Sequence, residues 1–327
     1  MGRIVAELIL KRENLSFRGV VDIDPKLQGI SLSKILKLEK DTEIIVESDL
    51  ASILAKNEID VVIIATSSSL EKVAPIIRQA INSGSNVISI CEELSYPFKK
   101  YPKLSDELDV LAKSNNVTIV GTGINPGYLM DLLPIVVTGP CQSVESIKVT
   151  RMMNSAKRRV PFQKKIGTGL TPEEFRRRID NKVITGHVGL IESIQMICGA
   201  LGFEYDDITE DPPKAVITET DFTTSYGELV PKGYVRGLRS RGIAKREGKV
   251  IVLLDFQAYA GDQDEYDSIE IEGTPNIHQK IIGGIHGDLG TSAMAVNLIP
   301  IVKKANAGLL TMKDLPVPCN TARLWKK

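Results

Sequence analysis

Apolar and polar positions in the first part of the chain follow two periodicities. The segment DVVIIAT (residues 60–66) is a continuous apolar run, which is typical of a strand buried on both faces. The segment LEKVAPIIRQAINSG (residues 70–84) repeats apolar residues every three or four positions, and this spacing predicts an amphipathic helix that ends at Gly84. Because such segments alternate up to about residue 140, we predict an α/β domain with a Rossmann-type parallel sheet over residues 1–140.

The pattern changes after Val144. Long segments separated by turn glycines, such as residues 144–153 and 234–260, predict extended strands. One helical insertion interrupts them, so we predict an α+β domain with a largely antiparallel sheet over residues 141–285, which would bind substrate and form a dimer contact. The segment TSAMAVNLIPIVKKA predicts a helix, and we expect residues 286–327 to return to the first domain as a C-terminal helix and tail.

Composition narrows the functional classes. The 43% hydrophobic content supports two sizeable cores, and 41 basic residues balance 41 acidic ones, so we expect no nucleic-acid or membrane partner. The four cysteines (Cys91, Cys141, Cys198 and Cys319) form no C-x-x-C pair, which argues against a metal site and favours a reducing cytoplasm. No apolar run approaches the roughly 20 residues of a membrane span.

The N-terminal segment resembles the second half of a dinucleotide-binding unit. Asp22 ends an apolar run about 20 residues after Gly2, which is the distance from a G-x-G-x-x-G loop to the acid that holds a ribose 2′-hydroxyl. Gly2 takes the place of the third glycine, and Arg3 opens the following helix. We therefore expect the first strand to be missing, with about a dozen residues before Met1 lost to a misplaced start codon. An ordinary α/β start with a chance glycine is the alternative.

Two further segments predict cofactor contacts. Gly121 begins GTGINPG, which follows a predicted strand, and no acid ends a strand at the right distance after it. We interpret it as a tight turn at the carboxyl edge of the sheet, where open α/β sheets bind ligands. Thr66 and Ser67 end another strand at that edge, although a helix N-cap cluster explains them equally well. Asp22 favours NAD as the cofactor, because a carboxylate repels the 2′-phosphate of NADP. NADP is the alternative cofactor.

The segment NVISICEELSYPF carries the candidate chemistry. Glu92 and Glu93 end a predicted buried strand at the edge where a nicotinamide would lie. Beside apolar neighbours, we expect one of the two carboxyl groups to have a pKa raised towards neutrality. Such a base suits oxidative deamination, because it first takes a proton from an ammonium group and then activates water. Solvated loop residues are the alternative.

Two residues of the second domain are candidate substrate contacts. His187 lies in GHVGL near a predicted helix start, and Arg158 lies in the basic stretch KRRV, where it would meet a substrate carboxylate. A structural histidine and a solvated charged face are the respective alternatives.

The segments MGR, VVDIDP, CEELSYP, GTGINPGYLMD, TGHVGLIESI, GDLGTSAMAVNLIP and GLLTMKDLPVP together resemble the 2,4-diaminopentanoate dehydrogenases and native amine dehydrogenases. This family shares the architecture of dihydrodipicolinate reductase, and the resemblance covers essentially the whole chain. It implies NAD(P)-dependent oxidative deamination of 2,4-diaminopentanoate to 2-amino-4-oxopentanoate, a step in ornithine fermentation. It also implies a catalytic glutamate in CEEL, for which Glu92 is the first candidate and Glu93 the second. In addition, it implies that Asn125, Pro126 and Gly127 lie beside the nicotinamide. We expect a homodimer.

Four alternative functions stay open. The first alternative is a dihydrodipicolinate reductase. That family is typically marked by adjacent histidines followed by a lysine, whereas His187, His278 and His286 are separated here, which weakens this alternative. Sugar oxidoreductases of similar layout carry Glu-Lys-Pro at the CEEL position, and that lysine is absent. An amine dehydrogenase for another small amine is the third alternative. The fourth is a degenerate, non-catalytic dinucleotide-binding relative, which the missing strand favours and the retained Glu92 and Asn125 oppose.

Overall fold

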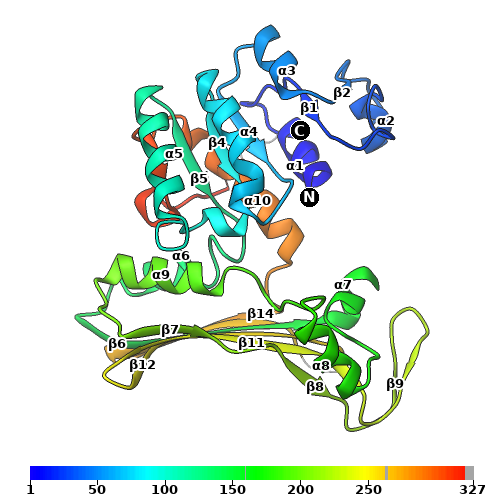
Figure 1. The fold of residues 1–327 in the computed structure, drawn as a ribbon, viewed down its shortest axis with the longest axis vertical. Helices are drawn as coiled ribbons and strands as arrows, with labels where there is room; N and C mark the ends of the chain where they lie inside the picture. The colour runs from blue at the N-terminus through cyan, green and yellow to red at the C-terminus, as the bar shows by residue number, and fades with distance from the viewer. Residues whose placement is uncertain (159, 262–263, 321–327) are drawn as a thin grey trace. The chain divides into compact units, whose positions relative to one another are not determined.

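The computed structural model describes residues 1–158, 160–261 and 264–320, and the chain divides into two compact units (Figure 1). Unit 1 comprises Met1–Gly127 and the chain from Gly287 onward, and unit 2 comprises Tyr128–His286. The first division therefore falls after Gly127 instead of after residue 140. The segment after Gly127 belongs to unit 2 because its helix α6 (Leu132–Val137) packs against α9 (Leu190–Leu201).

Unit 1 is built on a four-stranded parallel sheet in the order β15-β5-β4-β3. Its strands are β3 (Val61–Ile64), β4 (Asn86–Ser89), β5 (Thr118–Gly121) and β15 (Gly308–Leu310). The helices in contact with it are α4 (Leu70–Asn82), α5 (Pro102–Ser114) and α10 (Gly287–Val302). The apolar stripe of α4 is fully buried against the apolar runs of the strands, through side chains such as Ile77, Val87 and Ile119. Burying this apolar surface stabilises the layer of helix on sheet.

The N-terminal part of unit 1 contains α1 (Gly2–Leu10), β1 (Val20–Val21), α2 (Leu32–Leu36), β2 (Val46–Glu47) and α3 (Leu50–Lys56). Helix α1 packs on α10 through Val5, Ile9 and Val296. Strands β1 and β2 pair in parallel, but no ladder among the described residues joins them to the four-stranded sheet. The predicted parallel architecture is confirmed, and the described strands of unit 1 form two parallel sheets.

Unit 2 is built on a seven-stranded mixed sheet in the order β14-β13-β6-β12-β11-β7, with β8 also paired to β11. Strands β6 and β12 are parallel, and the other pairs are antiparallel, which confirms the predicted, largely antiparallel sheet. The strands of unit 2 are β6 (Ser143–Asn154), β7 (Asp207–Glu210), β8 (Lys214–Ile217), β9 (Phe222–Thr223), β10 (Leu229–Val230), β11 (Val235–Arg246), β12 (Lys249–Tyr259), β13 (Tyr266–Thr274) and β14 (Ile277–Ile282). Its further helices are α7 (Val160–Lys165) and α8 (Pro172–Asp180).

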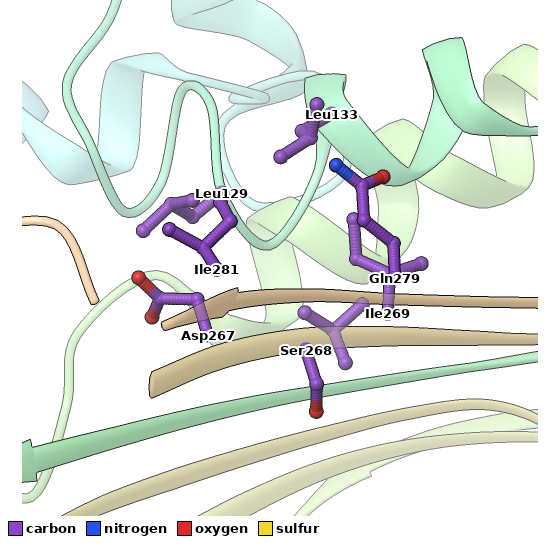
Figure 2. Close-up of a pocket in the computed structure, with 8 residues that line it drawn as sticks. Leu129, Leu133, Asp267, Ser268, Ile269, Gln279 and Ile281 are labelled. Carbon is purple, nitrogen blue, oxygen red and sulfur yellow. The ribbon is translucent and has the colours of Figure 1, made fainter. Parts of the chain in front are cut away.

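The two faces of this sheet differ in what covers them. Helix α9 packs on one face, where a Cβ added at Gly242 would lie 2.8 Å from Ile194 Cδ1. Leu129 and Leu133 lie over Ile269 on the same face and line a small pocket with it (Figure 2). No helix in the described part of the chain is long and apolar enough to span a membrane.

Candidate active site

Three of the predicted functional segments lie together at the carboxyl edge of the unit 1 sheet. Residues 65–69 follow β3, residues 91–94 follow β4, and residues 122–127 follow β5. The three strands are parallel, so their carboxyl ends meet at one edge. The Ser68 carbonyl joins two of the segments, because it accepts hydrogen bonds from the Glu93 N–H at 3.4 Å and from Cys91 Sγ at 3.1 Å.

The carboxylate of Glu93 is held by three donors. Its Oε1 atom accepts from Lys100 Nζ at 2.6 Å, and its Oε2 atom accepts from the Leu70 N–H and the Tyr101 hydroxyl, each at 2.8 Å. Burial opposes the charge on this side chain, but the hydrogen bonds outweigh it and hold the pKa of Glu93 below its usual value. Glu93 is therefore an ionised anchor between the turn after β4 and the first residue of α4.

Glu92 differs from its neighbour in its contacts. It opens the short 3₁₀ turn η1 (Glu92–Leu94), and its side chain is half-buried. The Glu92 carbonyl accepts a hydrogen bond from the Ser95 hydroxyl, whereas no described residue forms a hydrogen bond or ion pair with the Glu92 carboxylate. The backbone of this residue is fixed and its carboxylate keeps its lone pairs for a ligand. A general base requires this combination.

Cys91 precedes the two carboxylates and is buried. Burial raises the pKa of its thiol to about 12. The thiol donates to the Ser68 carbonyl, and burial disfavours its thiolate form. Cys91 therefore serves as a packing and anchoring residue of this edge.

The glycines after β5 permit close approaches of the backbone. A Cβ added at Gly121 would lie 2.5 Å from the Leu94 carbonyl carbon, so only glycine lets β5 end against η1. Gly127 has φ +122°, and a Cβ there would lie 2.3 Å from the Gly123 nitrogen. The Ile124 N–H donates to Thr291 Oγ1 of α10 at 3.1 Å, which fixes the turn from the other side. The peptide bond between Asn125 and Pro126 is cis.

The predicted contacts with the adenosine half of a cofactor lie in the N-terminal part of unit 1. Asp22 follows β1 directly, is half-buried, and accepts the Asp24 N–H at 2.9 Å. Gly2 is the first residue of α1, and a Cβ added there would meet nothing within 4 Å among the described residues. The close packing expected of a third glycine is therefore not formed by these residues, and the roles of Gly2 and the exposed Arg3 stay predictions.

The residues that follow the parallel strands of unit 1 fit a nicotinamide dinucleotide. The Thr122 hydroxyl is buried in the turn after β5 and has no hydrogen-bond partner among the described residues, so it is a polar group that a ligand can satisfy. Ser67 and the exposed Thr66 lie beyond the end of β3, and Asp22 lies beyond the end of β1. Hydroxyls and one carboxylate at the ends of parallel strands are the donor and acceptor set that binds ribose and amide groups.

Both predicted substrate contacts lie in unit 2. Arg158 Nη2 forms an ion pair with Glu265 Oε1 at 3.2 Å, and both side chains are largely buried. This ion pair already neutralises the charge that a substrate carboxylate would need. His187 stacks on Phe256, with ring centroids 4.5 Å apart, and precedes α9. Their substrate roles stay predictions.

The pocket drawn in Figure 2 is separate from all of these residues. Leu129, Leu133 and Ile281 line it together with the carboxyl of Asp267, and no predicted site residue is among its lining.

Several residues at the carboxyl edge escape sequence reasoning. Lys100, Tyr101 and Thr291 carry no motif of their own, and only the three-dimensional contacts identify them. The one sequence signal for Thr291 is its place in the family-like segment GDLGTSAM.

A sheet of parallel strands with its functional loops at the carboxyl edge, followed by a mixed-sheet unit, defines a Rossmann-type dehydrogenase. Residues 128–326 match the family described as "2,4-diaminopentanoate dehydrogenase C-terminal domain", and this match begins at the first residue of unit 2. The chain is 35% identical over 326 residues to the 2,4-diaminopentanoate dehydrogenase of Acetoanaerobium sticklandii, covering 97% of this chain and 91% of that one. The chain belongs to the 2,4-diaminopentanoate dehydrogenase family and is an enzyme of the dehydrogenase class.

Two amine dehydrogenases are more distant relatives. The amine dehydrogenase of Streptomyces virginiae is 22% identical over 355 residues, covering 100% of this chain and 96% of that one. The solved structure of the amine dehydrogenase from Mycobacterium smegmatis superimposes with a TM-score of 0.82 at 23% identity, covering 98% of this chain and 94% of that one. This likeness shows that the fold is shared.

Proposed function

We propose that this chain catalyses the NAD-dependent oxidative deamination of 2,4-diaminopentanoate to 2-amino-4-oxopentanoate and ammonia. The observation that carries the proposal is the half-buried Glu92 carboxylate, which has no hydrogen-bond or ion-pair partner among the described residues and lies at the carboxyl edge of the parallel sheet. The family and the 35% identical relative, whose name specifies this substrate, support the choice of amine.

In the proposed mechanism, Glu92 first takes a proton from the C4 ammonium group of the substrate. The lone pair of the resulting amine then assists the departure of hydride from C4, and a carbon–nitrogen double bond forms. When bound, the nicotinamide supplies the hydride acceptor. Glu92 then releases this proton to solvent and removes a proton from a water molecule, whose oxygen attacks the iminium carbon. Glu92 passes this second proton to the nitrogen of the adduct and takes up the hydroxyl proton as the adduct collapses. Collapse of this adduct releases ammonia and leaves the C4 ketone.

We assign cofactor contacts to residues at the ends of the unit 1 strands. Asp22 would hold the ribose 2′-hydroxyl and disfavour the 2′-phosphate of NADP. The turn from Gly121 to Gly127 would face the nicotinamide, where Asn125 offers an amide for the carboxamide group. Thr66 and Ser67 would contact the same cofactor from the end of β3.

We also propose that the enzyme is a homodimer, formed through the face of the unit 2 sheet opposite to α9. The strand register places half-buried or exposed apolar side chains from strands β11, β12, β13 and β14 on this face, namely Ile243, Leu253, Tyr259, Tyr266 and Ile282. Ile282 is 87% exposed. A second copy of the same face can cover these side chains, because an isologous interface pairs each patch with itself.

The test is steady-state formation of reduced cofactor from racemic 2,4-diaminopentanoate. We expect turnover with this substrate to exceed turnover with simple alkylamines of similar length. A preference for alkylamines would leave the deamination chemistry in place and reject the proposed substrate. Absence of any amine-dependent reduction of NAD or NADP would reject the proposed function.

A further inference from the structure

We propose that Glu93 is a positioning residue, which holds in place the turn that carries Glu92 and takes no proton from the substrate. This inference rests on the proposed function, because it assigns separate roles to the two adjacent carboxylates in one deamination reaction.

Glu93 ties three parts of unit 1 together. Its two oxygens accept from the Leu70 N–H at the start of α4, from Tyr101 at the start of α5, and from Lys100. Ser69, the N-cap residue of α4, provides no side-chain cap, so the Glu93 carboxylate takes over that function from 23 residues away. A carboxylate at a helix N-terminus is also favoured by the helix dipole.

These contacts make Glu93 a poor base. A base must accept a proton at an oxygen lone pair, and here both oxygens already accept strong hydrogen bonds, one of them from an ammonium group. Protonation would break the ion pair with Lys100 and leave the Leu70 N–H with a weaker acceptor. The charged groups around Glu93 are Lys100 and the neighbouring Glu92, with Glu71 close to Tyr101. The side chain of Glu93 is only 13% exposed, so its ion pair is partly shielded from solvent.

The same contacts determine where Glu92 lies. The turn η1 has only three residues, so contacts with neighbouring segments contribute to its conformation. It is fixed on one side by the Glu93 carboxylate and the Ser68 carbonyl, and on the other by the close approach of Gly121 to Leu94. Removal of the Glu93 carboxylate frees the α4 side of the turn and lets the Glu92 carboxylate move. A displacement of about 1 Å in a catalytic group is enough to cost on the order of 100-fold in rate.

The experiment compares Glu93→Gln, Glu93→Ala and Glu92→Gln, with Glu107→Gln as the matched control. Glu107 is an exposed carboxylate on α5 that also pairs with a cation, Arg78. A glutamine at position 93 keeps an oxygen that can accept from Leu70 and Tyr101, whereas alanine removes it. We expect kcat of Glu93→Gln to stay within about 10-fold of the parent, Glu93→Ala to lose about 100-fold, and Glu92→Gln to lose 100-fold to 10,000-fold.

Two readouts separate positioning from proton transfer. The acid limb of the kcat/KM profile should stay at the same pH in Glu93→Gln, because the titrating base is still present. A loss of that limb, or an activity as low as that of Glu92→Gln, would overturn the proposal. The second readout is thermal unfolding without cofactor, measured between about pH 3 and 7.

The unfolding experiment needs no enzyme activity. Because the folded-state pKa of Glu93 is lowered, its ionised form stabilises the fold above the unfolded-state pKa of about 4.3, and this contribution is lost as the pH falls. Glu93→Gln should therefore lower the Tm at pH 7 and reduce the loss of Tm on acidification, and Glu107→Gln should change both less. If the parent shows no amine oxidation but the unfolding result holds, the proposed function fails while the anchoring contacts stand. If Tm of Glu93→Gln equals that of the parent at every pH, the positioning role itself is refuted.

Discussion

The buried ion pair of Arg151 and Asp267 provides a sharp test of how unit 2 is held together. Arg151 Nη1 lies 3.2 Å from Asp267 Oδ1, and the side chains are 3% and 6% exposed. Both partners also form hydrogen bonds with the backbone of Ile285. Arg151 Nη2 donates to the Ile285 carbonyl at 2.7 Å, and the Ile285 N–H donates to Asp267 Oδ2 at 2.9 Å. The pair therefore fixes the segment at which the chain leaves unit 2.

Arg151→Met removes the cation and leaves the buried carboxylate without its partner. At an effective dielectric constant of about 20, two unit charges at this distance attract each other by about 5 kcal/mol. Breaking a buried pair by removing one partner typically costs about 3–5 kcal/mol. We expect urea unfolding followed by circular dichroism to show a loss of this size at pH 8. The control is Arg177→Met on α8 of the same unit, whose surface ion pair with Glu174 should contribute no more than about 1 kcal/mol.

The loss should depend on pH in a defined direction. Burial already raises the pKa of Asp267, and Arg151 opposes that rise. In Arg151→Met the pKa rises further, so folding becomes coupled to proton uptake and the variant gains stability relative to the parent as the pH falls. We therefore expect a smaller difference at pH 5 than at pH 8. A difference below about 1 kcal/mol at pH 8, or one that grows on acidification, would refute this account of the pair.

Three further predictions concern the carboxyl edge, the cofactor and the assembly. Gly121→Ala should lower stability by about 1–3 kcal/mol in urea unfolding, because the new Cβ meets the Leu94 backbone; an unchanged midpoint would show that η1 can move away freely. Asp22→Asn should raise the ratio of kcat/KM for NADP to that for NAD, and an unchanged ratio would remove Asp22 from the ribose site. Ile282→Asp should shift the parent dimer to monomer in light scattering, whereas Val110→Asp, at another exposed apolar position, should not. A monomeric parent would reject the proposed dimer.

Local patterns predicted most of the fold. The apolar run at residues 61–64 is β3, and the helical spacing after it is α4. These features depend on neighbours in the sequence, so they can be recognised without a structure. The apolar run that Asp22 ends pairs as a strand only at Val20–Val21, because pairing requires a partner strand that the local sequence does not specify.

The site was predictable in its segments and unpredictable in its contacts. The two adjacent glutamates are equivalent in sequence, yet Glu93 meets Leu70 from 23 residues away and Glu92 meets no described partner. Arg158 reads as a solvent-facing or substrate-facing cation, yet it pairs with Glu265, which is 107 residues away. Pairings of this kind depend on tertiary structure, and a single sequence contains no signal for them.

The central claim is that Glu92 is the base of an amine-oxidising reaction, and one comparison tests it most directly. Reduction of NAD by 2,4-diaminopentanoate is measured for the parent, Glu92→Gln and Glu107→Gln, alongside NAD affinity by calorimetry. We predict that Glu92→Gln loses at least about 100-fold in kcat and keeps the NAD affinity of the parent. Glu107→Gln should keep both the kcat and the NAD affinity of the parent. Near-parental turnover by Glu92→Gln would contradict the claim.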